Sequence, residues 1–302
     1  MRSTAQRLRR LAAGLGVGLG LALAACAAKA APQDKAQGYR FEIVTGDDGS
    51  AVTARITDDL YKRLVPTFAA FRTELAQRRR MVTIAVGPDA LRKVAARRCD
   101  CVVIAAFTSS QVWRSVLKKL PPARAAAMTA VYAEPAPLDQ LQLVSLLYRR
   151  PVRVAAILGQ HGDFFAPGLQ GRVEAVQAGP EDDINYLLGR LGRSEVLLAL
   201  PDSSVYTPEN VRSILLSTYR RKQAVIGFSS DMVKVGALAS TYSEVEDVNA
   251  QVAEVAASFV ATGELPAPQF PHYFRTAINE GVASSLDIVV SEDARRFARP
   301  RP

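Results

Sequence analysis

Small polar and aromatic residues follow several apolar runs of this sequence, each just after a run ends. They are Thr45, Gly87, Thr108, Ser109, Tyr132, Asp202, Ser203, Phe228 and Ser229. Hydroxyl groups and backbone amides can orient a small molecule, rings supply apolar area, and a carboxylate can pair with a ligand amine. An enzyme would need titratable groups in contrasting surroundings, and none stands out here. The set therefore predicts a reversible binding site with no catalytic residue.

Residues that commonly act in catalysis or metal binding are few. The two histidines are His161, which follows an apolar run, and His272, which lies in a proline-rich stretch and is assigned no role. His161 could line the binding site, although a solvent-facing loop position is the simpler interpretation. No G-x-S-x-G motif, Walker loop or H-E-x-x-H motif occurs. We expect no cofactor and no metal ion.

Two acidic turns leave an alternative open. Asp47 and Asp48 could hold a cation, but acids in a glycine-bracketed turn more often accept hydrogen bonds from backbone amides. Asp202 allows the same interpretation, less firmly, because its loop follows an apolar run that is expected to be a strand.

The clearest local unit spans residues 195–241. An apolar run at 196–200 ends in Pro-Asp-Ser-Ser, and a helix is predicted to begin at Pro208 with Thr207 as its N-cap. A second apolar run at 224–227 ends in Phe-Ser-Ser-Asp. Two buried strands joined by a helix indicate a parallel sheet. Ligands of such sheets bind beyond the carboxyl ends of the strands, so both polar loops are expected to contribute to the site.

The same alternation extends along the rest of the chain. Further strands are predicted at 41–44, 81–86, 101–106, 130–133, 152–158, 173–178 and 273–278. Helices are predicted at 60–75 with a bend at Pro66, and at 88–96, 112–120, 138–148, 184–191, 243–263 and 279–286. The long helix is expected to open with a Ser243-x-x-Glu246 capping box and to end at Gly263. The charged tail after Ser291 is expected to lack order.

The chain is long enough for two domains, with 302 residues of which 49% are hydrophobic. The prolines of residues 134–137 mark a crossing between them. We predict an α/β fold of two doubly wound parallel-sheet lobes joined by a multi-strand hinge. The N-terminal lobe would comprise 39–136 plus about 243–276, the C-terminal lobe 137–242, and the closing segment and tail 277–302.

The N-terminus has the pattern of an export signal. A basic segment ends at Arg10, an apolar stretch fills 11–25, and Leu23-Ala-Ala-Cys26 resembles the bacterial lipobox, whose cysteine is diacylated. The stretch is too short and too rich in glycine for a comfortable membrane span. We predict a signal peptide at 1–25, lipidation at Cys26 and a flexible tether at 26–38. The alternative is cleavage after residues 28–30, which would give a free periplasmic protein.

Export would place the remaining cysteines, Cys99 and Cys101, in an oxidising compartment. A Cys-x-Cys bridge is strained and rare, and one such pair without nearby histidines is a poor metal site. We interpret them as two cysteines that enter a buried strand.

The charge balance argues against nucleic acid as a partner. The formal charge is +9, and it falls to +5 without the four arginines of the first ten residues. The arginine triplet at 78–80 has no interleaved aromatic residues and suits the C-terminus of a helix.

From residue 130 onward the sequence resembles the substrate-binding proteins of ABC transporters that have the type I periplasmic-binding fold. The resemblance rests on Ala-Val-Tyr-Ala-Glu-Pro at 130–135, Asp-Gln-Leu at 139–141, Leu-Pro-Asp at 200–202, Val-Ile-Gly-Phe-Ser at 225–229, Val-Lys-Val-Gly-Ala-Leu-Ala at 233–239 and Ile-Asn at 278–279. It covers most of residues 80–290 and is weaker before Met81. Tyr132, Asp202, Phe228 and Ser229 lie on matched motifs, whereas Thr45, Gly87, Thr108 and Ser109 rest on their positions at strand ends.

The resemblance implies a monomeric solute receptor whose lobes close on a small molecule, amino-acid-like or aromatic, and present it to an ABC permease in the inner membrane. The protein would meet the membrane only through its lipid anchor. An alternative is a sensory or interaction lipoprotein that signals to a membrane partner instead of feeding a permease. An enzyme built on the same layers is the third hypothesis.

Overall fold

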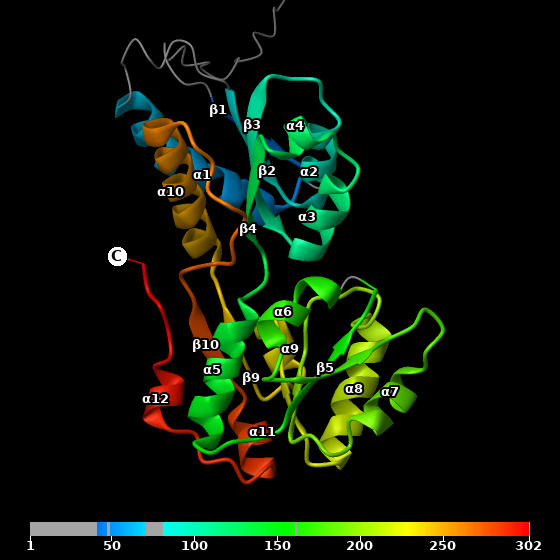
Figure 1. Ribbon diagram of the computed structural model, residues 1–302. Helices are drawn as coiled ribbons and strands as arrows, with labels where there is room; N and C mark the ends of the chain where they lie inside the picture. The colour runs from blue at the N-terminus through cyan, green and yellow to red at the C-terminus, as the bar shows by residue number, and fades with distance from the viewer. Residues whose placement is uncertain (1–40, 47–48, 71–80, 161, 302) are drawn as a thin grey trace, which may run out of the picture. The chain divides into compact units, whose positions relative to one another are not determined.

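The computed structural model describes residues 41–46, 49–70, 81–160 and 162–301, whose strands form two separate sheets (Figure 1). The signal peptide, the tether, Cys26, Asp47, Asp48 and His161 lie outside the described residues, so the predictions made for them remain predictions.

The first sheet, sheet A, contains four parallel strands. In spatial order they are β1 (Phe41–Thr45), β2 (Met81–Val86), β3 (Cys101–Thr108) and β4 (Met128–Tyr132). Its helices are α1 (Ala51–Ala70) and α10 (Val245–Thr262) on one face and α2 (Pro88–Ala95), α3 (Ser110–Leu117) and the short α4 (Pro122–Ala125) toward the other. In β3, Val102 and Ile104 pack with α1 and α10, whereas Val103 and Ala105 pack with α2 and α3. Successive side chains of a strand point to opposite faces, so an uninterrupted apolar strand is buried on both sides.

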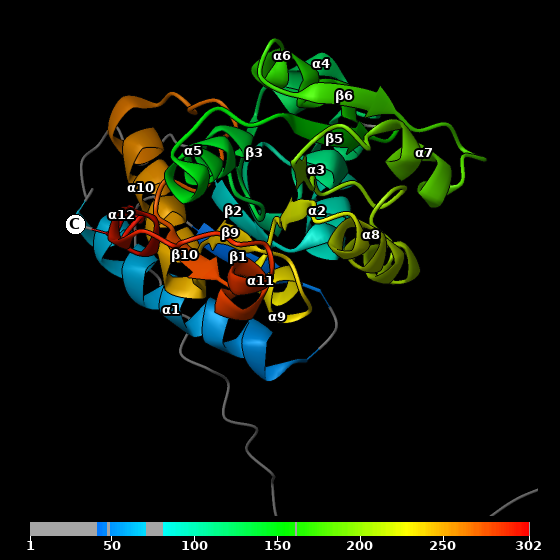
Figure 2. The ribbon, with the colours of Figure 1, turned by 90° about the horizontal axis from the view of Figure 1, so that it is seen from below.

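The second sheet, sheet B, contains six strands. In spatial order they are β10 (Arg275–Ile278), β9 (Ala239–Tyr242), β8 (Ala224–Ile226), β7 (Val196–Leu198), β5 (Val154–Leu158) and β6 (Glu174–Gln177). Its two faces are covered by α5 (Pro137–Tyr148), α6 (Ala166–Leu169), α11 (Glu280–Ser285) and α12 (Glu292–Arg295) on one side and by α7 (Ile184–Arg190), α8 (Pro208–Arg220) and α9 (Ser230–Lys234) on the other (Figure 2). The predicted α/β fold of two parallel-sheet lobes is confirmed.

Three chain segments connect the two sheets: 133–136, 243–244 and 263–274. The third segment runs beside β4, where the backbone N–H of Tyr132 donates to the carbonyl of Gln269 over 2.9 Å. Gln251 of α10 holds the same segment, because its Oε1 accepts from the N–H of His272 (2.7 Å) and its Nε2 donates to the carbonyl of Phe270 (3.1 Å). Side-chain amides thus fix the path of the chain between the sheets.

Local signals of helix boundaries were mostly correct. Thr207 caps α8, with its hydroxyl accepting from the N–H of Asn210, and Gly263 ends α10 at φ 79°. The predicted capping box is shifted by one residue, because α10 follows Glu244, whose N–H donates to Asp247. The strand β9 was not predicted. It is four residues long and lacks polar alternation, and it lies between parallel β8 and antiparallel β10.

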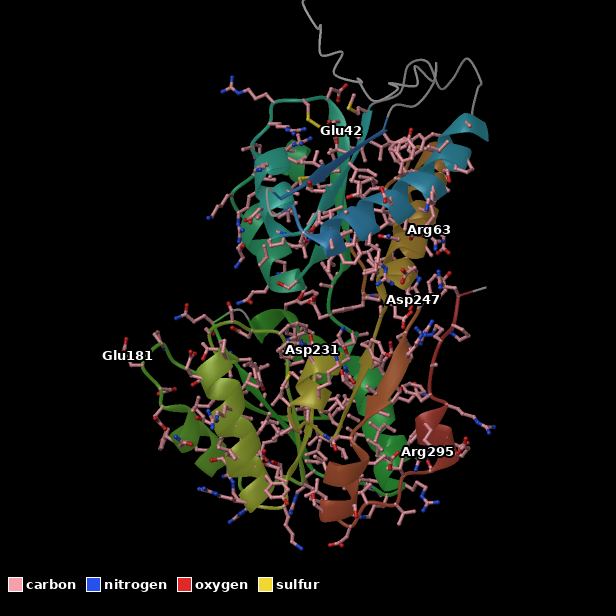
Figure 3. All side chains as sticks on the ribbon, turned by 180° about the vertical axis from the view of Figure 1, so that it is seen from behind. Glu42, Arg63, Glu181, Asp231, Asp247 and Arg295 are labelled. Carbon is pink, nitrogen blue, oxygen red and sulfur yellow. A yellow bond between two sulfur atoms is a disulfide. The ribbon has the colours of Figure 1, made fainter. Side chains whose placement is uncertain are left out.

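The prediction of an unordered tail was wrong. The tail contains α12, and Arg299 exchanges two backbone hydrogen bonds with Phe274 (2.9 and 3.0 Å). Arg301 ends beside α10, where its Nε lies 2.8 Å from Oδ1 of Asp247 (labelled in Figure 3), whose side chain is only 4% exposed. Arg295, Arg299 and Arg301 pair with Glu280, Asp139 and Asp247 on earlier elements of the chain.

The interpretation that both cysteines enter a buried strand holds only for Cys101, the buried first residue of β3. Cys99 is exposed in the turn before the strand, and the structure joins the two in the disulfide that was considered rare. The chain turns between α2 and β3 and brings their Cα atoms within 5.2 Å, inside the range that a disulfide can span. None of the described helices is both long and apolar enough to cross a membrane.

The ion pair of the tail gives a test of its order. We expect Arg301→Gln to lower the free energy of unfolding in urea by about 1–3 kcal/mol, because it leaves the buried carboxylate of Asp247 without its cation. The matched control is Arg296→Gln, which removes a pair whose arginine is 79% exposed and should change the free energy by less than about 0.5 kcal/mol. Equal effects of the two substitutions would show that the tail pair contributes nothing.

Candidate functional site

In sheet A, the predicted site residues lie at the carboxyl ends of the strands. Thr45, Thr108 and Tyr132 end β1, β3 and β4, Gly87 follows β2, and Ser109 precedes α3. Because the strands are parallel, their carboxyl ends share this edge. Tyr132 and Thr108 are buried, while the other three residues are partly exposed.

Sheet B places Asp202 and Ser203 after β7, and Phe228 and Ser229 after β8. Asp202 is buried and Ser203 exposed. Phe228 packs edge-on against Tyr206, with ring centroids 5.7 Å apart. Ser229 is the N-cap of α9 and accepts from the N–H of Met232.

A side chain that the sequence did not single out joins the two edges. Nε2 of Gln111, in the first turn of α3, donates to Oδ1 of Asp202 over 3.2 Å, and its Oε1 accepts from the N–H of Ser203 over 3.3 Å. The structure therefore brings Asp202 and Ser203 next to the start of α3, which Ser109 caps through the N–H of Val112.

The remaining predicted residues are not joined to this group by the contacts of the described residues. The hydroxyl of Thr108 donates to the carbonyl of Ala106, and Ser229 is occupied as a cap. Gly87 is the N-cap of α2 with φ 85°, a left-handed conformation that suits glycine. The known contacts of Thr108, Ser229 and Gly87 are thus structural ones at the carboxyl ends of the strands. A part in ligand binding remains a prediction for these three residues, and likewise for Thr45 and Phe228.

Asp202 lies where the strand order of sheet B reverses, since β6 and β7 flank β5 on opposite sides. Its Oδ1 also accepts from the N–H (2.9 Å) and hydroxyl (2.6 Å) of Ser204, while its buried Oδ2 has no partner among the described residues. Gly159, directly after β5, makes room for it: a Cβ there would lie 2.5 Å from Oδ2. Such a reversal is the usual ligand position in an open α/β sheet.

A second buried carboxylate meets the same helix. Glu134 lies in the segment between β4 and α5, is 3% exposed, and accepts the N–H of Ser110 through Oε1 over 2.8 Å. Burial raises the pKa of Glu134, opposed by its hydrogen bonds to Ser110. Its Oε2 is buried without a partner among the described residues. The Glu-Pro pair of the family-like motif was the signal that could have indicated this residue.

Three rings and one cation form a cluster around Tyr132, which lies two residues before Glu134. Tyr132 packs edge-on against Phe270 (5.2 Å) and Phe164 (6.1 Å). The guanidinium of Arg114, on α3, lies 4.5 Å from the centroid of the Phe164 ring. Burial and then the charge of Glu134 raise the pKa of Tyr132 to about 12, so its phenol stays protonated.

The group therefore offers two acceptor oxygens, a guanidinium and an aromatic cluster, all around α3 and the adjoining connections. In proteins, carboxylate oxygens bind ammonium groups, guanidinium groups bind anions, and aromatic rings bind apolar groups. In the described part of the chain, no group of three or more His, Cys, Asp or Glu side chains is placed to hold a metal ion.

Two surface hollows lie away from these residues. One, of about 640 Å³, is lined partly by Arg63, Arg275, Arg299 and Arg301, each of which already forms an ion pair with a carboxylate. The other, of about 580 Å³, lies between α9 and β10. Because the arginines of the larger hollow are paired internally, the carboxyl ends of the strands remain the better candidate for a binding site.

No protein-family model matches this sequence, and no curated protein is significantly similar to it. Solved structures do match its fold. The ligand-free, open structure of a substrate-binding protein with adhesive properties from Clostridium difficile has a TM-score of 0.59 at 12% identity, covering 85% of this chain and 98% of that one. An ABC domain in complex with L-Trp from Streptococcus pneumonia has a TM-score of 0.53 at 13% identity, covering 87% and 99%. A conserved domain protein from Vibrio cholerae has a TM-score of 0.52 at 13% identity, covering 86% and 98%.

This chain therefore shares the two-lobed α/β fold of these solved proteins, whose names include a substrate-binding protein and an ABC domain. At this level of identity the likeness establishes the fold, in agreement with the resemblance seen in the sequence.

The close approach at Gly159 gives a test of the geometry around Asp202. We expect Gly159→Ala to destabilise the protein by about 1–3 kcal/mol, because the added methyl group overlaps a carboxylate that three hydrogen bonds hold in place. Gly168→Ala is the matched control, since a Cβ there meets nothing within 4 Å. Urea unfolding of both variants measures the difference, and an unchanged stability of Gly159→Ala would contradict the packing described.

The buried carboxyl of Glu134 predicts a dependence of stability on pH. Since its pKa is raised on folding, its favourable contribution is complete below the ordinary value of 4.5 and is lost as pH rises through the folded value. Glu134→Gln keeps an acceptor for Ser110 but cannot ionise. We therefore compare the melting temperatures of Glu134→Gln and the wild type, both without ligand. We expect the difference to shift in favour of the variant as pH rises from about 4 to about 8. The exposed Glu181→Gln is the control; a difference for Glu134→Gln that does not change with pH would exclude a raised pKa.

Proposed function

We propose that this protein is an exported, non-enzymatic solute-binding protein that closes on a small molecule between the carboxyl edges of its two sheets. The observation that carries the proposal is the pair of buried carboxylates, Glu134 and Asp202, each with one oxygen that has no partner in the described structure. They follow strands of different sheets, and both accept hydrogen bonds from the first turn of α3. Leaving a buried acceptor unsatisfied costs about 1–3 kcal/mol, which a ligand with donor groups would offset.

The ligand that suits these groups is amino-acid-like, with an aromatic or apolar side chain. Its ammonium group would donate to Oδ2 of Asp202 and Oε2 of Glu134, and its carboxylate would pair with Arg114. Its side chain would lie against Tyr132 and Phe270. The structural relative solved with L-Trp supports this chemistry.

Binding would proceed by hinge closure. The proposed lobes are 39–136 with 243–276, and 137–242, and the ligand would contact both, so it would bind the closed state more tightly and shift the population toward it. The hydrogen bonds of Gln111 to Asp202 and Ser203 would stabilise the closed state even when no ligand is bound. Thr45, Gly87, Thr108, Ser109, Phe228 and Ser229 would form the outer parts of the cleft.

The predicted lipid anchor at Cys26 would hold the receptor at the membrane, where it would deliver its ligand as a monomer to an ABC permease. The names of the structural relatives, an ABC domain and a substrate-binding protein, favour this role. If the gene lies beside a sensor kinase instead of permease and ATPase genes, the same receptor would signal to a membrane partner.

Native mass spectrometry of the purified protein, followed by a thermal-shift screen of amino acids, tests the proposal. A ligand at 100 times its Kd should add about 2.7 kcal/mol of stability. We expect Asp202→Asn to weaken its binding by on the order of 10- to 100-fold, through loss of a charge-assisted hydrogen bond. Asp231→Asn, which removes an exposed carboxylate paired with Lys234 on α9 (Figure 3), is the control. Binding that Asp202→Asn leaves unchanged would exclude this site, and steady turnover of the ligand would show an enzyme.

A further inference from the structure

The Cys99–Cys101 disulfide lies at the opposite end of β3 from Thr108, away from the candidate binding site. Cys99 is exposed in the turn before the strand, whereas Cys101, the first residue of β3, is only 4% exposed. Of the two cysteines, Cys99 is therefore the one that a reactant from solvent can reach. Figure 3 draws this disulfide in yellow.

One arginine contacts both sulfur atoms. Arg124, in α4, places Nη2 3.5 Å from Sγ of Cys99 and 3.5 Å from Sγ of Cys101, with Nη1 3.6 Å from the latter. The same guanidinium donates to the carbonyls of Cys101 (2.8 Å) and Val94 (3.2 Å). Because backbone carbonyls fix its position, the guanidinium would remain beside the sulfurs when the disulfide opens.

This guanidinium is a cation without a matching anion. Its contacts in the described structure are to carbonyl oxygens and sulfurs, none is to a carboxylate, and its Nε is buried without a partner. Burial lowers the pKa of Arg124, as expected for a cation that is desolvated and not compensated. Arg124 is only partly buried, but removing part of a charge from water without a counterion still has a cost. A thiolate, which appears only after reduction, would supply the missing negative charge.

We propose that Cys99, Cys101 and Arg124 form a thiol–disulfide exchange site whose reactant is a dithiol, either a small molecule or the paired cysteines of a partner protein. Thiol–disulfide exchange is fastest when the leaving sulfur is stabilised as a thiolate, and a neighbouring arginine provides that stabilisation.

The exchange balances as follows. One thiolate of the dithiol attacks Sγ of Cys99, a mixed disulfide forms, and the Cys99–Cys101 bond breaks with Cys101 leaving as a thiolate beside Arg124. The second thiolate of the reactant then attacks the reactant's other sulfur, which is bonded to Cys99 in the mixed disulfide, and Cys99 is released. The reactant leaves as a disulfide, two electrons have passed to the cysteine pair, and the protons of the dithiol go to Cys99 and to solvent.

The position of the pair fits reversible chemistry better than a structural staple. The two cysteines are separated by two positions, and a disulfide that closes so short a loop removes little conformational entropy from the unfolded chain. Reduction should therefore leave the fold intact. The guanidinium also disfavours a metal ion at the two sulfurs, because it would repel the cation.

The test follows reduction of the full-length protein by dithiothreitol at pH 7, with iodoacetamide trapping and peptide mapping to separate Cys99 and Cys101 from Cys26. We expect both cysteines of the wild type to become alkylated while the circular dichroism spectrum and melting transition are retained. Arg124→Gln should slow reduction about tenfold, the effect of losing one charge-assisted contact. Arg124→Lys keeps a cation and should lie between the two.

The matched control is Arg97→Gln, which removes a nearby arginine that is instead paired with Glu42 over 2.8 Å and should leave the rate unchanged. A rate for Arg124→Gln equal to that of the wild type overturns the proposal, as does a wild-type disulfide that dithiothreitol reduces only on unfolding. Should Arg124→Gln fail to fold, Arg124→Lys decides, and a rate equal to or above the wild type overturns the proposal.

Discussion

The first turn of α3 is the point on which the site depends. The N–H of Ser110 is satisfied by Glu134, from the connection that leaves sheet A, and the side chain of the next residue, Gln111, bonds to Asp202 of sheet B. A helix N-terminus needs acceptors for its free amides and favours negative charge. Here the carboxylate of Glu134, in the connecting segment, supplies the acceptor for the N–H of Ser110. The side chain of Gln111 links the same helix to the loop that follows β7 of sheet B.

This arrangement leaves two carboxylate oxygens buried without hydrogen-bond donors among the described residues, which destabilises the protein when no ligand is bound. In Asp202 and in Glu134, one carboxylate oxygen accepts hydrogen bonds from the protein, and the other is buried without a partner among the described residues. Nearby, Gln140 bonds to Gly227 and Thr241, and Gln251 fixes the segment that carries Phe270. The buried hydroxyls of Ser110, Tyr206 and Thr241 also lack a partner among the described residues. Oδ2 of Asp202 and Oε2 of Glu134 are the carboxylate oxygens among these atoms, and both follow the carboxyl ends of strands, where ligands of α/β sheets bind.

Much of the fold could be predicted because its signals are local. The N-cap Thr207, the C-cap Gly263 and the apolar run of β3 each act within a few residues, and each is found where it was expected. Two of the errors share one cause. Strand β9 is defined by its two neighbours, and the tail is ordered by Asp247 and Phe274, which lie far away in the sequence. Pairing with distant residues leaves no periodic pattern in the segment itself.

The sequence alone determined the α/β class, the alternation of strands and helices, and the presence of small polar and aromatic residues at strand ends, because helix caps and apolar periodicity depend on neighbouring residues. Only the tertiary structure decided which of these residues meet. It joined Asp202 to Gln111, buried Glu134 beside Ser110 and paired Cys99 with Cys101 under Arg124. These contacts depend on how the chain crosses between sheets and returns, and such long-range geometry is set by the packing of the whole core.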